Sequence, residues 1–351
     1  MVTLLRHLDR TLFEPHLVVF YRFYGFWFER DIPSDVGVHV LDVRHARKAL
    51  PKLLATIWRI RPAVIVSTQG YINFAVLLLH PLFPRVRLVV REVIGEREHF
   101  LEKSRYRGLL LRLYLHLMRR ADRIVTQSEA AARETTARVG PRPGQLLWLH
   151  NPVDVARLER EAHAGASPFV GPGPHLLALG RLTRQKGFDL LLDAFAGVRA
   201  AGVPAELTIV GEGEEQGTLQ LQAERLGITD AVRFAGFQGN PPAYYGHADV
   251  FVLSSRYEGM PNAVLEALAC GCPVVAFDCP HGVREIVRDG VNGLLVPPED
   301  VPALRDALVR LLRSRETRAR LRAQIAPTLG PVAAPAVAAR WAALLAAVTT
   351  Q

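Results

Sequence analysis

The chain has 351 residues, 49% of them hydrophobic and 22% charged, and a chain of this length is expected to form two domains. It holds no run of about 18 uninterrupted apolar residues, so no membrane-spanning helix is expected. The formal net charge of +9 comes from the first half: residues 1–170 hold 26 Lys and Arg against 16 Asp and Glu, whereas residues 171–351 hold 17 against 18. This asymmetry predicts an anionic partner for the N-terminal half: a membrane surface, a nucleic acid or a phosphorylated substrate.

Short apolar runs alternate with helical stretches along the whole chain. In the first half the predicted strands are His16–Phe20, Val64–Ser67, Leu88–Val90, Arg123–Thr126 and Gln145–Leu149. In the second half they are His175–Leu179, Glu206–Val210, Val232–Ala235, Val250–Leu253, Pro273–Ala276 and Gly293–Val296. Buried strands that alternate with helices indicate an α/β fold of parallel, doubly wound sheets. Ligands of such sheets bind beyond the carboxyl ends of the strands.

A Gly-, Pro- and Ala-rich segment, His163–His175, predicts the linker between two such domains. We expect an N-terminal domain over residues 1–165 and a C-terminal domain over residues 166–328. Residues 329–351 are expected to form a helix that packs back on the N-terminal domain. Two doubly wound domains joined in this way leave a cleft between them.

A basic helix is predicted over Tyr106–Arg123. Its cations stand at helical spacing, and they are Arg105, Arg112, His116, Arg119 and Arg123. A basic amphipathic helix is typical of membrane-surface binding, and the alternative is a core helix with one solvated face. The aromatic cluster Tyr21–Phe28 would suit the same interface or a lipid acceptor. Nucleic-acid binding would share the charge, but the chain has no recognition motif for it.

Two cations follow the first predicted strand of the second half, in the loop Gly180–Gly187. Gly180 lets a ligand approach the backbone closely, and Arg181 and Lys186 could neutralise a diphosphate. A solvated basic loop is the alternative. Further along, Val232–Phe237 is a strand followed by a glycine turn, where backbone groups of Gly236 and Phe237 could read the edge of a base.

The most informative segment is Ser254–Pro273, which carries two glutamates eight positions apart, Glu258 and Glu266. Glu258 is expected in a loop, and Glu266 in a helix that Pro261 opens at its first position. The free N–H groups of that first turn could bind an anion. Two acceptor carboxylates and a positive helix end at one place suit a ligand with hydroxyls and phosphate. The nearby Cys270, Cys272 and Cys279 read as core thiols rather than as a metal site.

Taken in order, these motifs resemble the donor half of retaining glycosyltransferases of family 4, which have the GT-B architecture. The match runs over about Leu176–Pro298 and includes Gly180-Arg181, Lys186-Gly187 and the Glu-x7-Glu of Glu258 and Glu266. Asn151–Asp154 resembles the signature that closes the N-terminal domain in this family. The segment 278–286 is most similar to members that build bacterial surface glycans.

The resemblance implies a role for each matching residue. Arg181 and Lys186 would hold the donor diphosphate, Glu258 would contact the transferred sugar, and Glu266 would bind the ribose hydroxyls. The implied catalytic residues are Glu258, Arg181 and Lys186. The implied donor-binding residues are Gly180, Arg181, Lys186, Gly236, Phe237, Glu258, Gly259, Met260, Pro261, Asn262 and Glu266. Transfer without a bound metal or other cofactor is also implied, and the donor half has no Asp-x-Asp motif.

The N-terminal half departs from this family at its start. Family members open with a strand and a glycine-rich loop, whereas Thr3–Asp9 already reads as the end of the first helix and Phe13–Phe20 as the second strand. We expect either a true start upstream of Met1 or a degraded N-terminal domain. On the acceptor side, Glu92 and His99 are the candidates for a residue facing the sugar.

The resulting hypothesis is a retaining hexosyltransferase that moves a sugar from a nucleotide-sugar donor, expected to be UDP-linked, to a glycan or lipid-linked acceptor. We expect it in the cytoplasm, peripheral on the inner face of the cell membrane. One alternative is a non-catalytic nucleotide-sugar-binding relative disabled by N-terminal truncation. Another is a sugar-nucleotide epimerase of the same architecture.

Overall fold

The computed structural model describes residues 1–21, 31–43, 46–92, 106–171 and 173–350. Contacts divide the chain into two compact units. The first unit comprises Met1–Pro152 and Ala334–Gln351, and the second comprises Val153–Ala333. Of the aromatic cluster Tyr21–Phe28, only Tyr21 lies within the described residues.

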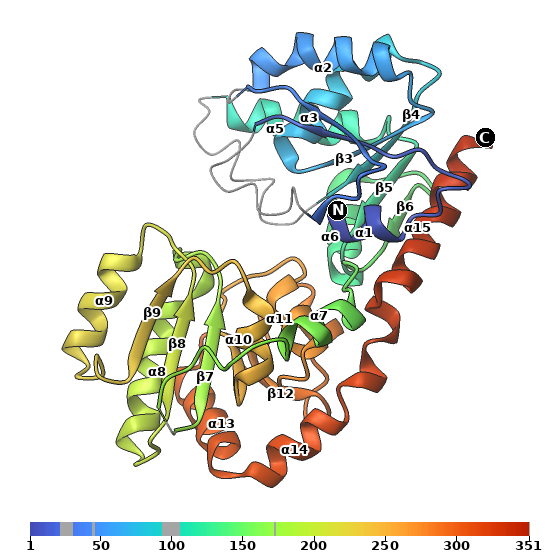
Figure 1. The fold of residues 1–351 in the computed structure, drawn as a ribbon. Helices are drawn as coiled ribbons and strands as arrows, with labels where there is room; N and C mark the ends of the chain where they lie inside the picture. The colour runs from blue at the N-terminus through green and yellow to red at the C-terminus, as the bar shows by residue number, and fades with distance from the viewer. Residues whose placement is uncertain (22–30, 44–45, 93–105, 172, 351) are drawn as a thin grey trace. The chain divides into compact units, whose positions relative to one another are not determined.

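The first unit contains two parallel sheets (Figure 1). The strands β1 (His16–Val19) and β2 (Gly37–Val40) pair with each other. The second sheet has the order β3-β4-β5-β6, and its strands are Val64–Thr68, Arg87–Arg91, Arg123–Thr126 and Leu146–Trp148. Within the described residues no strand of one sheet pairs with a strand of the other.

Helices cover both faces of the four-stranded sheet. Successive side chains of each strand point to opposite faces, so both faces carry apolar residues that need cover. In β4, Leu88 and Val90 join a core cluster with α2 (Ala46–Ile60), α3 (Gly70–Leu79) and α5 (Arg107–Met118). Val89 faces the other way. It packs in a second cluster with α1 (Val2–His7) and the C-terminal helix α15 (Ala334–Thr349). The helix α6 (Glu129–Val139) follows β5.

The second unit is a six-stranded parallel sheet of order β12-β11-β10-β7-β8-β9. Its strands in chain order are His175–Leu179, Glu206–Val210, Val232–Gly236, Val250–Leu253, Val274–Phe277 and Gly293–Val296. Its helices α7 to α14 are Val155–Ala162, Phe188–Ala200, Gln216–Arg225, Pro241–His247, Asn262–Ala269, Val283–Ile286, Val301–Arg313 and Arg315–Ala323. The α/β fold of parallel, doubly wound sheets expected from the sequence is confirmed.

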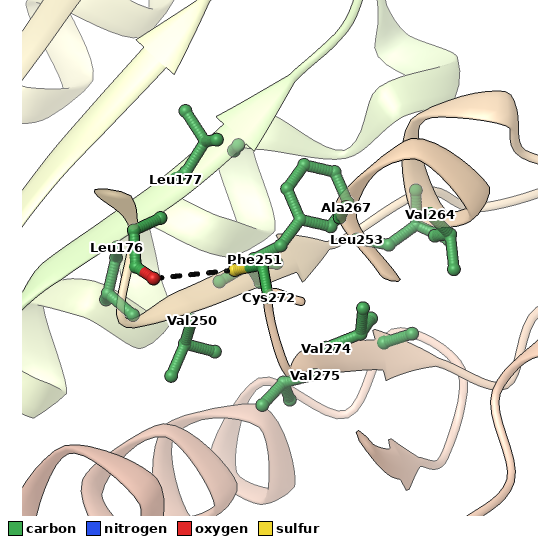
Figure 2. Close-up of a cluster of buried hydrophobic side chains, with 14 of the residues drawn as sticks. Leu176, Leu177, Val250, Phe251, Leu253, Val264, Ala267, Cys272, Val274 and Val275 are labelled. Carbon is green, nitrogen blue, oxygen red and sulfur yellow. Dashed lines mark hydrogen bonds between the residues drawn. The ribbon is translucent and has the colours of Figure 1, made fainter. Parts of the chain in front are cut away.

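The core of the second unit lies around the central strands β7, β10 and β11. Figure 2 shows apolar side chains of these strands packed together with Val264 and Ala267 of α11. The three cysteines are free and buried, as expected for core thiols. Burial raises the pKa of Cys272 and of Cys279 to about 12, so both remain protonated at neutral pH.

The boundary between the units differs from the expected one after residue 165. The helix α7 was expected in the N-terminal domain, but it packs on α10 and α11 of the second unit. Its last residue, Ala162, is fully buried in that core. The predicted linker over residues 163–175 therefore runs inside the second unit.

Candidate functional site

The order of the second sheet reverses direction between β7 and β10, which creates a topological switch point. Two loops leave the sheet there: Gly180–Gly187 after β7 and Ser254–Met260 after β10. The sequence singled out both loops, and the fold brings them together.

The two loops meet in an ion pair between Lys186 and Glu258. Lys186 Nζ donates to Glu258 Oε1 at 2.6 Å, and Ser255 Oγ donates to the same oxygen at 2.7 Å. Glu258 is only 6% exposed. Its Oε2 receives no hydrogen bond from the described residues, so one carboxylate oxygen remains for a ligand. Arg181, by contrast, is exposed and can turn toward an anion.

Close backbone contacts explain why glycines stand in the first loop. Gly187 has a φ of +61°, and a Cβ there would lie 2.1 Å from the Ser254 carbonyl oxygen. A Cβ at Gly180 would lie within 3.2–3.4 Å of the Lys186 side-chain carbons. Glycine at both positions therefore lets the loops approach and leaves room for the Lys186 side chain.

A set of contacts made by Arg256 joins the same two loops, and it was not predicted from the sequence. We call these contacts the Arg256 clamp. Arg256 binds Asp189 of α8 with two bonds, of 2.8 and 2.7 Å, and also forms an ion pair with Glu299 at 3.1 Å. A further bond of 2.9 Å goes to the Arg184 carbonyl oxygen in the first loop. The hydrogen bond from Arg256 lowers the pKa of Asp189. Because Arg256 stands two residues before Glu258, this clamp fixes the loop that carries the glutamate.

The other glutamate, Glu266, lies on α11 and is partly buried. Tyr245 of α10 donates its hydroxyl hydrogen to Glu266 Oε2 at 3.3 Å. Burial raises the pKa of Glu266 to about 7, and the Tyr245 hydrogen bond opposes that rise. Glu266 is therefore poised to change its charge near neutral pH.

The start of α11 differs by one position from the expected one. Pro261 has extended backbone and is the N-cap, so Asn262 is the first helical residue. Met260 is buried in the hydrophobic core. The Gly259 carbonyl oxygen accepts a hydrogen bond of 2.9 Å from the Gly282 N–H, which ties this loop to the segment after β11. His281 in that segment adopts the left-handed φ of +84°, a strained conformation for a residue other than glycine.

The backbone groups expected to read a base already have partners. The Gly236 carbonyl oxygen accepts from the Gly211 N–H at 2.8 Å. The Phe237 N–H is directed at Glu212 Oε1, at 3.4 Å. The Phe237 side chain is half exposed and remains a candidate wall for a ligand.

In the first unit, Glu92 lies at the end of β4 and is fully buried. It accepts a hydrogen bond of 2.5 Å from the buried Tyr114 hydroxyl, which also lies 3.5 Å from Asn73 Nδ2. These contacts favour a structural role for Glu92 over contact with an acceptor. The other acceptor-side candidate, His99, lies outside the described residues.

The exposed face of α5 carries cations along one side and apolar residues along the other. Arg112, His116 and Arg119 line a shallow hollow with Arg138 of α6. Exposed apolar side chains run beside them, and these are Tyr106, Leu109 and Leu113. Arg123 belongs to β5 rather than to this helix, and Arg105 lies outside the described residues. In the described part of the chain, no helix is long and apolar enough to cross a bilayer.

Comparison with known proteins shows which family the second unit resembles. The model of "Glycosyl transferases group 1" matches residues 159–326. A lipopolysaccharide core biosynthesis glycosyltransferase, LpsE, of Rhizobium meliloti is 36% identical over 169 residues, which are 48% of this chain and 46% of that protein. An N-acetylgalactosaminyltransferase of Campylobacter jejuni is 26% identical over 247 residues, which are 70% of this chain and 66% of that protein. Its name gives a diphospho-undecaprenol-linked acceptor. The chain thus spans about half to two thirds of these curated relatives.

Solved structures agree on the fold of the whole chain. Anabaena HepE in complex with UDP-glucose superposes with a TM-score of 0.78 at 20% identity, over 95% of this chain and 91% of that one. A glycosyltransferase of Rickettsia africae gives a TM-score of 0.76 at 11% identity, over 99% and 93%. These matches extend over nearly the whole chain. Residues 159–326 therefore match the glycosyl transferases group 1 family, and the fold of the chain is that of GT-B glycosyltransferases.

Proposed function

We propose that this protein is a retaining hexosyltransferase that moves a sugar from a nucleotide-sugar donor, UDP-linked, to a glycan or lipid-linked acceptor. The observation that carries the proposal is the Lys186–Glu258 ion pair at the switch point, with the exposed Arg181 in the same loop as Lys186. HepE, solved with UDP-glucose, and the diphospho-undecaprenol acceptor in the name of the Campylobacter relative support the donor and acceptor classes.

In this proposal the residues act through charge and position. Arg181 and Lys186 stabilise the diphosphate as negative charge develops on the leaving nucleotide. Glu258 orients the transferred sugar through its available oxygen, since its other oxygen is held by Lys186 and Ser255. Glu266 accepts from the ribose hydroxyls. Two cations at the diphosphate supply the electrostatic stabilisation that a metal would otherwise provide.

The test is to incubate the protein with a panel of UDP- and GDP-sugars and to measure both thermal stabilisation and nucleotide release. A transferase is stabilised by its donor and also releases nucleotide, with retention seen in the product by NMR. Stabilisation without turnover in the presence of lipid-linked and glycan acceptors would indicate the non-catalytic binding relative. An epimerised sugar that is still nucleotide-linked would indicate the epimerase.

The Arg256 clamp leads to a first prediction. Arg256→Met should lower kcat/KM by roughly 10- to 100-fold, because the loops that carry Lys186 and Glu258 lose their common anchor. Arg256→Lys should restore little, since lysine cannot bind Asp189 with two parallel bonds. The control is Arg199→Met, which removes the ion pair with Asp230 near the protein surface. Steady-state kinetics of all three variants check the prediction, and equal activities would contradict it.

The α5 face supports a second part of the proposal, peripheral binding to an anionic membrane on its cytoplasmic side. Cations attract anionic headgroups, and exposed leucines beside them can enter the interface between headgroups and acyl chains. Leu109, at 68% exposed, is the most accessible of these apolar side chains on α5.

Vesicle flotation tests this binding. The protein should float with phosphatidylglycerol vesicles and stay behind with phosphatidylcholine vesicles. Arg112→Ser together with Arg119→Ser should lower the vesicle partition coefficient roughly 30-fold, from about 1 kcal/mol for each cation. Arg133→Ser, on the exposed surface of α6, is the control. Equal flotation of the double variant and the wild type would rule out this face.

A further inference from the structure

Tyr245 is a buried side chain whose polar end meets the proposed donor site. It lies on α10 and is 0% exposed, and its ring packs edge-on against Phe251 with centroids 5.5 Å apart. Its hydroxyl lies 3.3 Å from Glu266 Oε2. The aromatic contact fixes where the ring can be, so the hydroxyl position is fixed as well.

A buried tyrosine hydroxyl needs a hydrogen-bond partner, and here the partner is the Glu266 carboxylate. Glu266 as a whole residue is partly exposed, in contrast to the fully buried Tyr245. A glutamate side chain without a hydrogen-bond partner samples several rotamers, and fixing one rotamer when a ligand binds costs free energy. A bond already made to Oε2 removes part of that cost before the ligand arrives.

We propose that Tyr245 is a positioning residue, whose hydroxyl holds Oε2 of Glu266 and leaves Oε1 to accept from the two hydroxyls of a nucleotide ribose. The inference rests on the proposed function, because it takes Glu266 to be the ribose ligand. It goes further by assigning how the Glu266 carboxylate is oriented and which residue controls the ionisation of that carboxylate.

The charges around Glu266 make the inference testable through pH. Burial raises the pKa of Glu266 to about 7, and Tyr245 is the neighbour that lowers it. The other titratable groups close by stay protonated at neutral pH: burial raises the pKa of Cys270, Cys272 and Tyr245 itself. On α7, Glu159 and Glu161 act on Cys270.

The sign of the pH effect follows from these groups. The ionised carboxylate accepts two hydroxyl hydrogens, so ribose binding strengthens as pH rises through the Glu266 pKa and weakens below it. Removing the Tyr245 hydroxyl removes a bond that favours the ionised form. The pKa of Glu266 then rises further, and the midpoint of binding moves to higher pH.

The experiment compares wild type, Tyr245→Phe and Tyr244→Phe by calorimetry with uridine. Uridine carries the ribose without a phosphate that would titrate in the same range. Tyr244 is the matched control, a buried tyrosine of the same helix that packs against Phe169. For wild type, affinity should fall about tenfold from about pH 8 to pH 6. For Tyr245→Phe the midpoint should lie about one pH unit higher, which makes binding roughly fivefold weaker at about pH 7.

Two further measurements separate positioning from loss of folding. Thermal denaturation should show Tyr245→Phe folded, since the phenyl ring keeps its contact with Phe251. The pH dependence should vanish for 2′,3′-dideoxyuridine, which lacks both hydroxyls. Equal midpoints for wild type and Tyr245→Phe, with uridine bound by both, would overturn this inference alone. If wild type binds neither uridine nor UDP at any pH, the proposed function fails, and this inference with it.

Discussion

Replacing Lys186 with methionine is expected to lower the rate of sugar transfer by about 100- to 1,000-fold, the effect of removing one preorganised electrostatic group. The ammonium lies 2.6 Å from Glu258 Oε1 and at the loop where the diphosphate is proposed to bind. Methionine keeps the length of the side chain but removes its charge. In the proposed mechanism the leaving nucleotide then lacks one of its two cations, and Glu258 loses one of the two hydrogen bonds that hold its Oε1.

The same substitution should also lower stability, and this effect can be separated from catalysis. An unpaired carboxylate remains at Glu258, at a cost of roughly 3 kcal/mol, the low end for a buried pair because Lys186 keeps some exposure. In the double variant Lys186→Met with Glu258→Gln no charge is left unpaired, so stability should largely return while activity stays low. Arg157→Met, which breaks a partly exposed pair with Glu161, is the control. Turnover of Lys186→Met within tenfold of wild type would contradict the proposed site.

The second large effect is expected in the first unit. Trp341 of α15 is 2% exposed and packs against the sheet in a cluster with Val89 and Val125. Trp341→Ala should cost about 3–5 kcal/mol, since a large side chain is lost from a closed core. The melting temperature of the first unit should fall by roughly 10 °C.

Calorimetry checks this prediction, with Trp58→Ala as the matched control because Trp58 is 60% exposed. The transition of the second unit should keep its temperature in both variants, because α15 belongs to the first unit. Similar shifts for Trp341→Ala and Trp58→Ala would show that α15 is not needed to hold the first unit together.

Much of the second unit could be predicted because its strands are continuous apolar runs that end at glycine or a polar loop. The predicted bounds of His175–Leu179 and Val250–Leu253 are those of β7 and β10. Parallel sheets bury both faces, so such runs stand out from the helices around them. The switch point follows from the strand order, and it brings together Lys186 and Glu258, whose loops the sequence had marked.

The features that were missed depend on contacts distant in sequence or on weak local patterns. Arg256 reaches Asp189, and Tyr245 reaches Glu266, through pairings that no local motif encodes. The strand β2, Gly37–Val40, was not predicted, because four residues with a glycine and a histidine give little apolar signal. The unit boundary was misplaced because a Gly- and Pro-rich loop looks the same inside a domain as between domains.

The second unit begins and ends at one place. The Val153 N–H donates to the Val332 carbonyl oxygen at 2.9 Å, and Val153 pairs with Ala333 in a parallel bridge. The first unit is therefore interrupted, and α15 completes it from the far end of the chain. During synthesis on the ribosome, the sheet face around Val89 lacks the larger part of its cover until α15 has emerged, because only α1 precedes it. The unit that is made first is therefore the last to finish folding, and until then its open face is exposed to chaperones and to other chains.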